Sequence, residues 1–144
     1  MMSYEVERNC LIRMPDVSRL RQNRTLESHI RQTYLLCPPG VTERVRERVS
    51  NGTAVYTHTI KKRITAVTAE EKEQTVSRQE YDRLLERSDP SRRAIEKDRF
   101  VLPYQNHNLE IDIYPVWSRQ AVLEIELQSE EESFSLPPVI TVLR

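Results

Sequence analysis

Glycine is scarce in this chain of 144 residues, where it occurs only at Gly40 and Gly52. The sequence therefore has no Gly/Ser-rich linker, and it shows no internal repeat, so we expect a single domain over residues 1–144. It also lacks the G-x-x-x-x-G-K-[ST] loop of P-loop nucleotide binders and the G-x-S-x-G turn of serine hydrolases. These absences exclude two common ways of building a phosphate site or a nucleophile.

Cysteine and long apolar runs are almost as scarce. Cys10 and Cys37 have no metal-binding spacing and are too few for a disulfide framework, so reduced thiols are predicted, with one disulfide as the alternative. No run of about 18 apolar residues exists, which excludes a membrane-spanning helix. The N-terminus, MMSYEVER, has no apolar signal-peptide core. We therefore expect a cytoplasmic protein without a membrane partner.

A net charge is also missing, because 22 basic residues balance 22 acidic ones. This balance argues against a protein that is held to nucleic acid by bulk charge, and the short basic run at residues 61–63 is better read as a strand end. Charged residues make up 31% of the chain and hydrophobic residues 38%, which is typical of a globular protein.

Charges of one sign stand at every second position in several short stretches. Residues i and i+2 of a β-strand point to the same face of a sheet, so each stretch aims like charges at one face. The acidic pairs are Glu5 with Glu7, Glu110 with Asp112 and Glu124 with Glu126, and the basic sets are Arg44, Arg46 and Arg48, and Lys97 with Arg99. Apolar residues fill the intervening positions of the last two acidic stretches and point to the opposite face of the sheet. The charged face is therefore predicted to be a functional surface.

Carboxylates and cations gathered in one cavity suit a divalent metal bound to a polyphosphate. The Cα atoms of Glu124 and Glu126 would lie roughly 6.5–7 Å apart on a strand, so both carboxylates can approach one cation. Mg²⁺ and Mn²⁺ take oxygen ligands, guanidinium groups bind phosphate through two N–H groups, and lysine acts as a point charge. A solvated strand face, or a ladder of salt bridges between acidic and basic strands, is the alternative.

Turn signals and alternation predict a mainly β protein with a few helices. Expected strands cover residues 3–10, 29–36, 42–50, 53–61, 69–76, 95–102, 108–114 and 120–128. Asn51-Gly52 predicts a tight hairpin, Asp16 a cap for a helix over 16–26, and Ser77-Arg78-Gln79-Glu80 a capping box. The second helix should stop before Asp89-Pro90, and Pro103 with the turn at 105–108 should join the two strands around them.

The short links between the expected strands favour antiparallel pairing. A polar face this densely charged favours a sheet that closes into a barrel. We therefore predict an α+β, mainly β fold: a closed antiparallel eight-stranded barrel, or tunnel, with the charges inside and short helices outside.

These stretches resemble motifs of the CYTH superfamily, the triphosphate tunnel metalloenzymes, in the order in which that family carries them. The family's E-x-E-x-K, R-Q-x-Y-L, R-x-R, T-x-K, E-K-x-R-(Y/F), E-(V/L/I)-D-(V/I)-(Y/F) and E-(V/I)-E-(L/F) motifs resemble residues 5–9, 31–35, 44–46, 59–61, 96–100, 110–114 and 124–127. The similarity covers nearly the whole chain. The family includes class IV adenylyl cyclases, thiamine triphosphatases and inorganic triphosphatases.

The resemblance implies a closed tunnel in which acids bind Mg²⁺ or Mn²⁺ and basic residues hold a triphosphate. By this resemblance the metal ligands are Glu5, Glu7, Asp112, Glu124 and Glu126. The phosphate-binding residues are Arg44, Arg46, Lys61, Lys97 and Arg99, of which Lys61 and Arg99 are also assigned to catalysis. The expected activity is hydrolysis of a linear triphosphate, with inorganic tripolyphosphate first and thiamine triphosphatase or adenylyl cyclase as alternatives. The expected partner is this small molecule, and a homodimer is left open.

The sequence departs from the family pattern at three places. Asn9 stands where the family has lysine, and Ala69 stands where an R-x-E-x-E strand has arginine. The chain also stops at Arg144, so we expect the usual C-terminal segment to be lacking. These departures motivate a second hypothesis, a non-catalytic module that binds polyphosphate or nucleotide.

Overall fold

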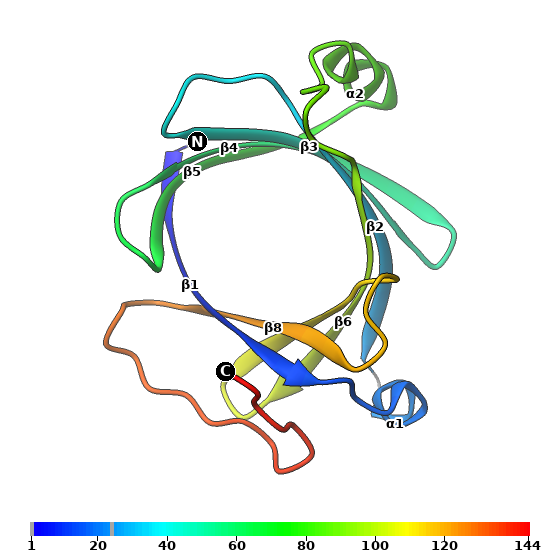
Figure 1. Ribbon diagram of the computed structural model, residues 1–144, viewed down its shortest axis with the longest axis vertical. Coiled ribbons are helices and arrows are strands. Elements are labelled where there is room, and N and C mark those ends of the chain that lie inside the picture. Colours follow the sequence, from blue (N-terminus) through cyan, green and yellow to red (C-terminus); the bar gives the residue numbers. More distant parts are fainter. Residues whose placement is uncertain (1, 24) are drawn as a thin grey trace. The chain divides into compact units, whose positions relative to one another are not determined.

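The computed structural model describes residues 2–23 and 25–144, and within them the chain forms eight strands and two short helices (Figure 1). The strands are β1 (Met2–Arg13), β2 (Leu26–Tyr34), β3 (Val41–Ser50), β4 (Thr53–Arg63), β5 (Thr68–Val76), β6 (Ile95–Tyr104), β7 (His107–Ile113) and β8 (Gln120–Leu127), and the helices are α1 (Val17–Gln22) and α2 (Arg78–Leu85). Hydrogen bonds join the strands in the order β1-β5-β4-β3-β2-β6-β7-β8, and the ring closes as a barrel. The predicted fold class is confirmed.

Two compact units divide the chain. The first unit contains the N-terminal residues through Glu5 and His29–Glu96, which include β3, β4, β5 and α2. The second unit contains Val6–Ser28 and Lys97–Arg144, which include α1, β7 and β8. Each unit has a hydrophobic core of its own. Among the described residues, no helix is long and apolar enough to cross a membrane.

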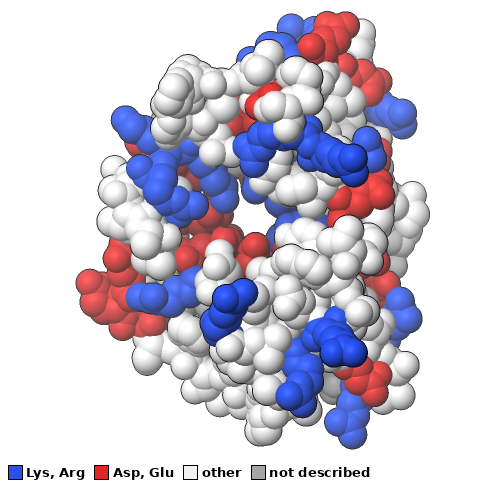
Figure 2. Space-filling view, viewed as in Figure 1, with Lys and Arg blue, Asp and Glu red and all other residues white. Residues whose placement is uncertain are grey.

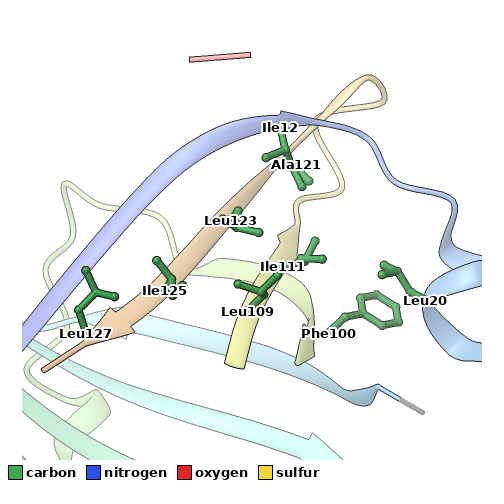
Figure 3. Close-up of a cluster of buried hydrophobic side chains, with 9 residues drawn as sticks. All are labelled: Ile12, Leu20, Phe100, Leu109, Ile111, Ala121, Leu123, Ile125 and Leu127. Carbon is green, nitrogen blue, oxygen red and sulfur yellow. The ribbon is translucent and has the colours of Figure 1, made fainter. Parts of the chain in front are cut away.

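The core of the second unit lies on the apolar face of β7 and β8. Leu109 and Ile111 alternate along β7 and are fully buried, and Leu123 and Ile125 do the same along β8 (Figure 3). Burying a side chain of this size contributes about 1.5–3 kcal/mol. Because strand side chains alternate between faces, this core also fixes the direction of the acidic residues between these positions.

The core of the first unit is built between α2 and the sheet. Tyr81 and Leu84 of α2 are buried in one cluster with Val45 of β3 and Tyr56 of β4. The helix begins as predicted, because the Ser77 hydroxyl accepts a hydrogen bond from the backbone N–H of Glu80 at 3.1 Å. The second half of the predicted capping box does not form, since the carboxylate of Glu80 binds Arg83 instead.

Several element boundaries differ from the sequence-based expectation: β1 continues to Arg13 instead of ending at residue 10, and β2 covers Leu26–Tyr34 instead of 29–36. Helix α1 ends at Gln22 rather than at residue 26, because the Asn23 side chain donates to the carbonyl of Arg19 at 2.8 Å and β2 starts at Leu26. Pro103 lies inside β6, opposite Asn108, and the tight turn is confined to residues 105–106. The hairpin at Asn51-Gly52 is confirmed, with φ angles of 51° and 77° that suit a primed turn.

The C-terminal residues run beside the end of β1. The N–H of Leu11 donates to Arg144 O at 2.9 Å, Leu143 N–H donates back to Leu11 O at 2.8 Å, and Arg13 N–H donates to Thr141 O at 2.9 Å. On its other edge the same part of β1 pairs with β8, in the register Leu11 opposite Val122. The apolar segment at residues 139–143 is therefore partly built into the sheet of the second unit.

Glu43 ties β4 and the segment after α2 to β3 in the first unit. Its carboxylate lies 2.6 Å from His58 Nε2 and accepts from Arg87 Nη2 at 2.6 Å. Burial raises the pKa of Glu43, but Arg87 and His58 outweigh burial and hold that pKa below its ordinary value. A carboxyl whose folded-state pKa is lowered stabilises the fold above its unfolded-state pKa, and this stabilisation is lost as the pH falls through the folded-state value.

We therefore expect Glu43→Gln to lower the free energy of unfolding at pH 7 by about 1–2 kcal/mol. The difference between the wild type and this variant should shrink as the pH falls from the ordinary pKa of glutamate through the lower folded-state pKa of Glu43, because the folded wild type then loses the same charge. Urea unfolding at pH 7 and pH 4 measures both effects. Glu86→Gln, at an exposed position, is the control. A difference that does not change with pH would contradict this prediction.

Candidate functional site

Asp112 is the centre of the charged face of the second unit. Its side chain is 0% exposed, and it accepts hydrogen bonds from Lys97 Nζ at 2.7 Å and from Arg99 Nε and Nη2 at 2.7 and 2.9 Å. Burial raises the pKa of Asp112, but Arg99 and Lys97 outweigh it, so the pKa lies below its ordinary value. Asp112 is thus a buried carboxylate whose two oxygens are both bound by cations.

Arg99 connects Asp112 to two further acids. Its Nη1 lies 2.5 Å from Glu110, and its Nη2 lies 3.2 Å from Glu124. Register explains this cluster, because Arg99 faces Asp112 across β6 and β7, and Glu110 faces Glu124 across β7 and β8. Burial raises the pKa of Glu110, and the charges of Glu124, Glu126 and Asp112 add to this rise against the effect of Arg99. Negative charge is therefore crowded around Glu110.

Glu7 of β1 lies directly opposite Glu126 of β8. One carboxylate oxygen of each residue lies within 4.8 Å of the other. Like charges at directly opposed positions destabilise a sheet, and a divalent cation with oxygen ligands would relieve that repulsion. Two positions further along, Asn9 lies opposite Glu124, so the residue that departs from the family motif faces one of the predicted metal ligands.

A cavity of about 420 Å³ opens beside these acids in the second unit. It is lined by Val101, Asn106, His107, Asn108, Glu110, Glu126, Gln128 and Glu132. His107 Nε2 lies 2.9 Å from Glu132, which orders one side of the cavity. Glu110 and Glu126 thus face a space that is large enough for a small molecule.

Lys61 is the centre of a second acidic group, in the first unit. Its Nζ donates to Glu5 at 2.7 Å and lies 3.4 Å from Glu71. Burial raises the pKa of Glu5, but Lys61 outweighs it and leaves that pKa below its ordinary value. Burial, with the neighbouring carboxylate of Glu5, raises the pKa of Glu71 to about 7. The two acids therefore share one ammonium group, and as the pH rises Glu71 keeps its proton to a higher pH than Glu5 does.

The arginine row of β3 lies on the same face of the first unit. Arg46 donates from Nε and Nη2 to Gln32 Oε1 at 3.2 and 2.7 Å. Arg44 is paired with Tyr34 of β2 and with Thr59 of β4. Its Nε is buried and has no hydrogen-bond partner among the described residues. A buried N–H without an acceptor is unfavourable, so this atom indicates a position for an oxygen of a ligand or of water.

Acidic and basic side chains lie next to one another over the face seen in Figure 2. Of the predicted site residues, the structure brings Lys97, Arg99, Asp112 and Glu124 into one hydrogen-bonded cluster, places Glu7 opposite Glu126, and joins Lys61 to Glu5. Their roles as metal or phosphate ligands stay predictions.

Sequence reasoning left Glu110, Glu71 and Gln32 out of the site. Glu110 could have been found, because it alternates with Asp112 and shares its face. Glu71 carried the same signal with Glu73 on β5. Gln32 is a neutral residue and could be recognised only from its register opposite Arg46.

Comparisons with known proteins agree with the fold. No model of a protein family matches the sequence, and no curated protein matches it. Solved structures do match: the PH1012 protein of Pyrococcus horikoshii has a TM-score of 0.63 at 16% identity, over 88% of this chain and 81% of that one. The Hippeastrum protein HpAC1, a candidate adenylyl cyclase described as having a dominant triphosphatase activity, has a TM-score of 0.57 at 18% identity, over 88% and 81%.

A candidate adenylate cyclase of Bacillus halodurans has a TM-score of 0.58 at 19% identity, over 90% of this chain and 83% of that one. At these identities the comparisons establish a shared fold. The resemblance that the motifs indicated is thereby confirmed at the level of the fold, and the structural neighbours include proteins described as adenylyl cyclases and as a triphosphatase.

Proposed function

We propose that this protein is a metal-dependent phosphohydrolase that acts on a linear triphosphate, with inorganic tripolyphosphate as the first substrate. The observation that carries the proposal is the arrangement around Arg99. A buried guanidinium is fixed among Asp112, Glu110 and Glu124, beside a cavity that Glu110 and Glu126 line. Fixed cations next to clustered carboxylates are the groups needed to hold a metal–polyphosphate complex.

The carboxylate groups fit a hard divalent cation. Glu7 and Glu126 offer oxygens from opposed positions, and Glu5 points to the same side of β1 as Glu7. In the proposal Glu5, Glu7, Glu124 and Glu126 hold Mg²⁺ or Mn²⁺. Asp112 is a further predicted ligand, although its two oxygens already accept three hydrogen bonds from Lys97 and Arg99. The cation would lower the pKa of a bound water and neutralise phosphate charge.

The basic residues then bind and orient the phosphate chain. Arg99 has five N–H groups, and its contacts with Asp112, Glu110 and Glu124 occupy four of them, which leaves one at Nη1 for a phosphate oxygen. Lys97 uses one N–H for Asp112 and has two more. These groups would stabilise the charge that develops on the transferred phosphoryl group, which is the main requirement of this chemistry. Arg44, Arg46 and Lys61 of the first unit are the other predicted phosphate-binding residues.

A substrate panel tests the proposal. With Mg²⁺ or Mn²⁺, the purified protein should release phosphate from tripolyphosphate faster than from thiamine triphosphate or ATP. Assays for phosphate, pyrophosphate and cyclic nucleotide separate hydrolysis from cyclisation, and chelation by EDTA should abolish turnover. Release of pyrophosphate and a cyclic nucleotide from ATP would contradict the proposed hydrolysis and indicate that the protein is a nucleotide cyclase.

A binding module without catalysis is the second candidate function. The observation that favours it is Asn9, an uncharged residue opposite Glu124 where the family motif has a lysine. Calorimetry that detects metal-dependent binding of tripolyphosphate, without turnover of any substrate in the panel, would support this candidate. Absence of binding would overturn both functions.

A further inference from the structure

The segment that follows α2 is fastened to the end of β2 in the first unit. The backbone N–H of Asp89 donates to Tyr34 O at 2.9 Å, and that of Leu36 donates to Arg87 O at 2.9 Å. The carboxylate of Asp89 accepts from Ser91 N–H at 2.9 Å and from its hydroxyl at 2.7 Å, and Arg92 N–H donates to Asp89 O at 3.2 Å. These bonds form an ordered turn, and the turn fixes the backbone of Arg92 relative to Tyr34.

The side chain of Arg92 stacks on the ring of Tyr34. Its guanidinium carbon lies 3.6 Å from the ring centroid. Stacking of a guanidinium uses the flat face of the group, whereas its N–H donors point outward in the plane. The ring therefore holds the charge in place and leaves the donor edge for an anion. Because the turn and the ring both restrict Arg92 beforehand, less conformational entropy is lost when a ligand binds.

Tyr34 places this charge at the end of the arginine row. Tyr34 is paired with Arg44, and its hydroxyl accepts from Gln32 Nε2 at 3.0 Å, while Gln32 in turn accepts from Arg46. Side chains at directly opposed positions of a sheet lie next to one another, so Arg44 and Tyr34 are neighbours on the charged face. The buried Nε of Arg44, which has no partner in the described part of the chain, belongs to this same group.

We propose that Arg92, held on Tyr34, forms with Arg44 an additional anion subsite that binds one phosphoryl group of a linear polyphosphate. The identity of the anion rests on the proposed function. The unpartnered Nε of Arg44 and the donor edge of Arg92 supply N–H groups that phosphate oxygens accept, and arginine can bind such oxygens through two N–H groups at once. Arg92 is thus a residue that sets affinity for the phosphate chain, and it comes from a loop rather than from a strand.

Calorimetry of tripolyphosphate binding to the metal-free protein, in EDTA, tests the subsite without requiring turnover. We expect Arg92→Ala to weaken binding about tenfold, the usual size of one charge-assisted contact. Arg92→Lys should also bind more weakly than the wild type, because an ammonium group lacks the planar fork. Arg93→Ala is the matched control, since it removes an exposed arginine from the next position of the same loop and should leave the affinity unchanged.

A double-mutant cycle tests the role of the ring. Tyr34→Leu removes the stacking surface and should by itself weaken the binding of tripolyphosphate. Added to Arg92→Ala, it should have little further effect on this binding. Thermal unfolding of each variant shows whether it remains folded. Wild-type affinity in Arg92→Ala, or an equal loss in Arg93→Ala, would overturn the subsite and leave the proposed function standing. A wild type that binds no tripolyphosphate, with or without Mg²⁺, would overturn the proposed function and the subsite together.

Discussion

Phosphate release from tripolyphosphate is expected to fall about 10²–10³-fold when Glu124 and Glu126 are both replaced by glutamine. Glutamine keeps the size of the side chain and one acceptor oxygen, but it removes both negative charges. Hard divalent cations are held mainly by charged oxygen ligands, so the Mg²⁺ or Mn²⁺ site should weaken while the β-strand is retained. The acceptor at position 124 also preserves a hydrogen bond for Arg99.

Steady-state phosphate assays across a range of Mg²⁺ and Mn²⁺ concentrations measure this effect, and thermal unfolding with and without Mn²⁺ provides a readout that does not depend on turnover. The wild type should be stabilised by Mn²⁺, and the double variant should not. Glu131→Gln removes an exposed acid that follows β8 closely and serves as the control. Equal rates of phosphate release in the wild type and the double variant would contradict the metal-dependent mechanism.

The second large effect concerns stability. Asp112→Ala is expected to lower the free energy of unfolding by about 3–5 kcal/mol, because removing one partner of a buried ion pair leaves the other charge uncompensated. Asp112 is 0% exposed, and the side chains of Lys97 and Arg99 that it binds are only 4% and 10% exposed. This loss is a large share of the stability of an ordinary domain, so the milder variant Asp112→Asn is measured beside it.

Urea unfolding of the metal-free protein at neutral pH is the measurement, with Glu131→Gln as an exposed control in the same unit. The experiment also separates the two roles considered for Asp112. A large loss of stability without metal supports a residue that holds Lys97 and Arg99 in place. Unchanged stability without metal, combined with loss of the stabilisation by Mn²⁺, would make Asp112 a metal ligand instead.

The alternation of β7 and β8 could be predicted from the sequence because it is local. Leu109 and Ile111 take one face and Glu110 and Asp112 the other, so a period of two residues was enough to predict both the core and the charged face. Alternation does not determine which strands pair or in which register. The opposition of Glu7 to Glu126 is a long-range contact, and neither stretch by itself indicates it.

The interaction partners of the side chains could not be predicted from the sequence either. The spacing of Lys97 and Arg99 indicated a shared face, yet it could not show that both residues bind Asp112. Arg92 carries no periodic signal at all, because it lies in a loop whose position depends on backbone contacts with the end of β2. Helix α1 was predicted too long for a similar reason, since Asp16 marks its start in the sequence, whereas its end depends on the side-chain bond of Asn23 and on the start of β2 at Leu26.

The docking of residues 141–144 on β1 has a consequence for self-association. An uncovered strand edge offers unpaired N–H and C=O groups to which a second molecule can add, and such addition is a common start of aggregation. From Leu11 to Arg13, β1 is occupied by β8 on one side and by the chain's own terminus on the other. Residues 141–144 thus cover the free edge of β1, the strand that carries Glu7, and leave that part of the edge closed to pairing with a second molecule.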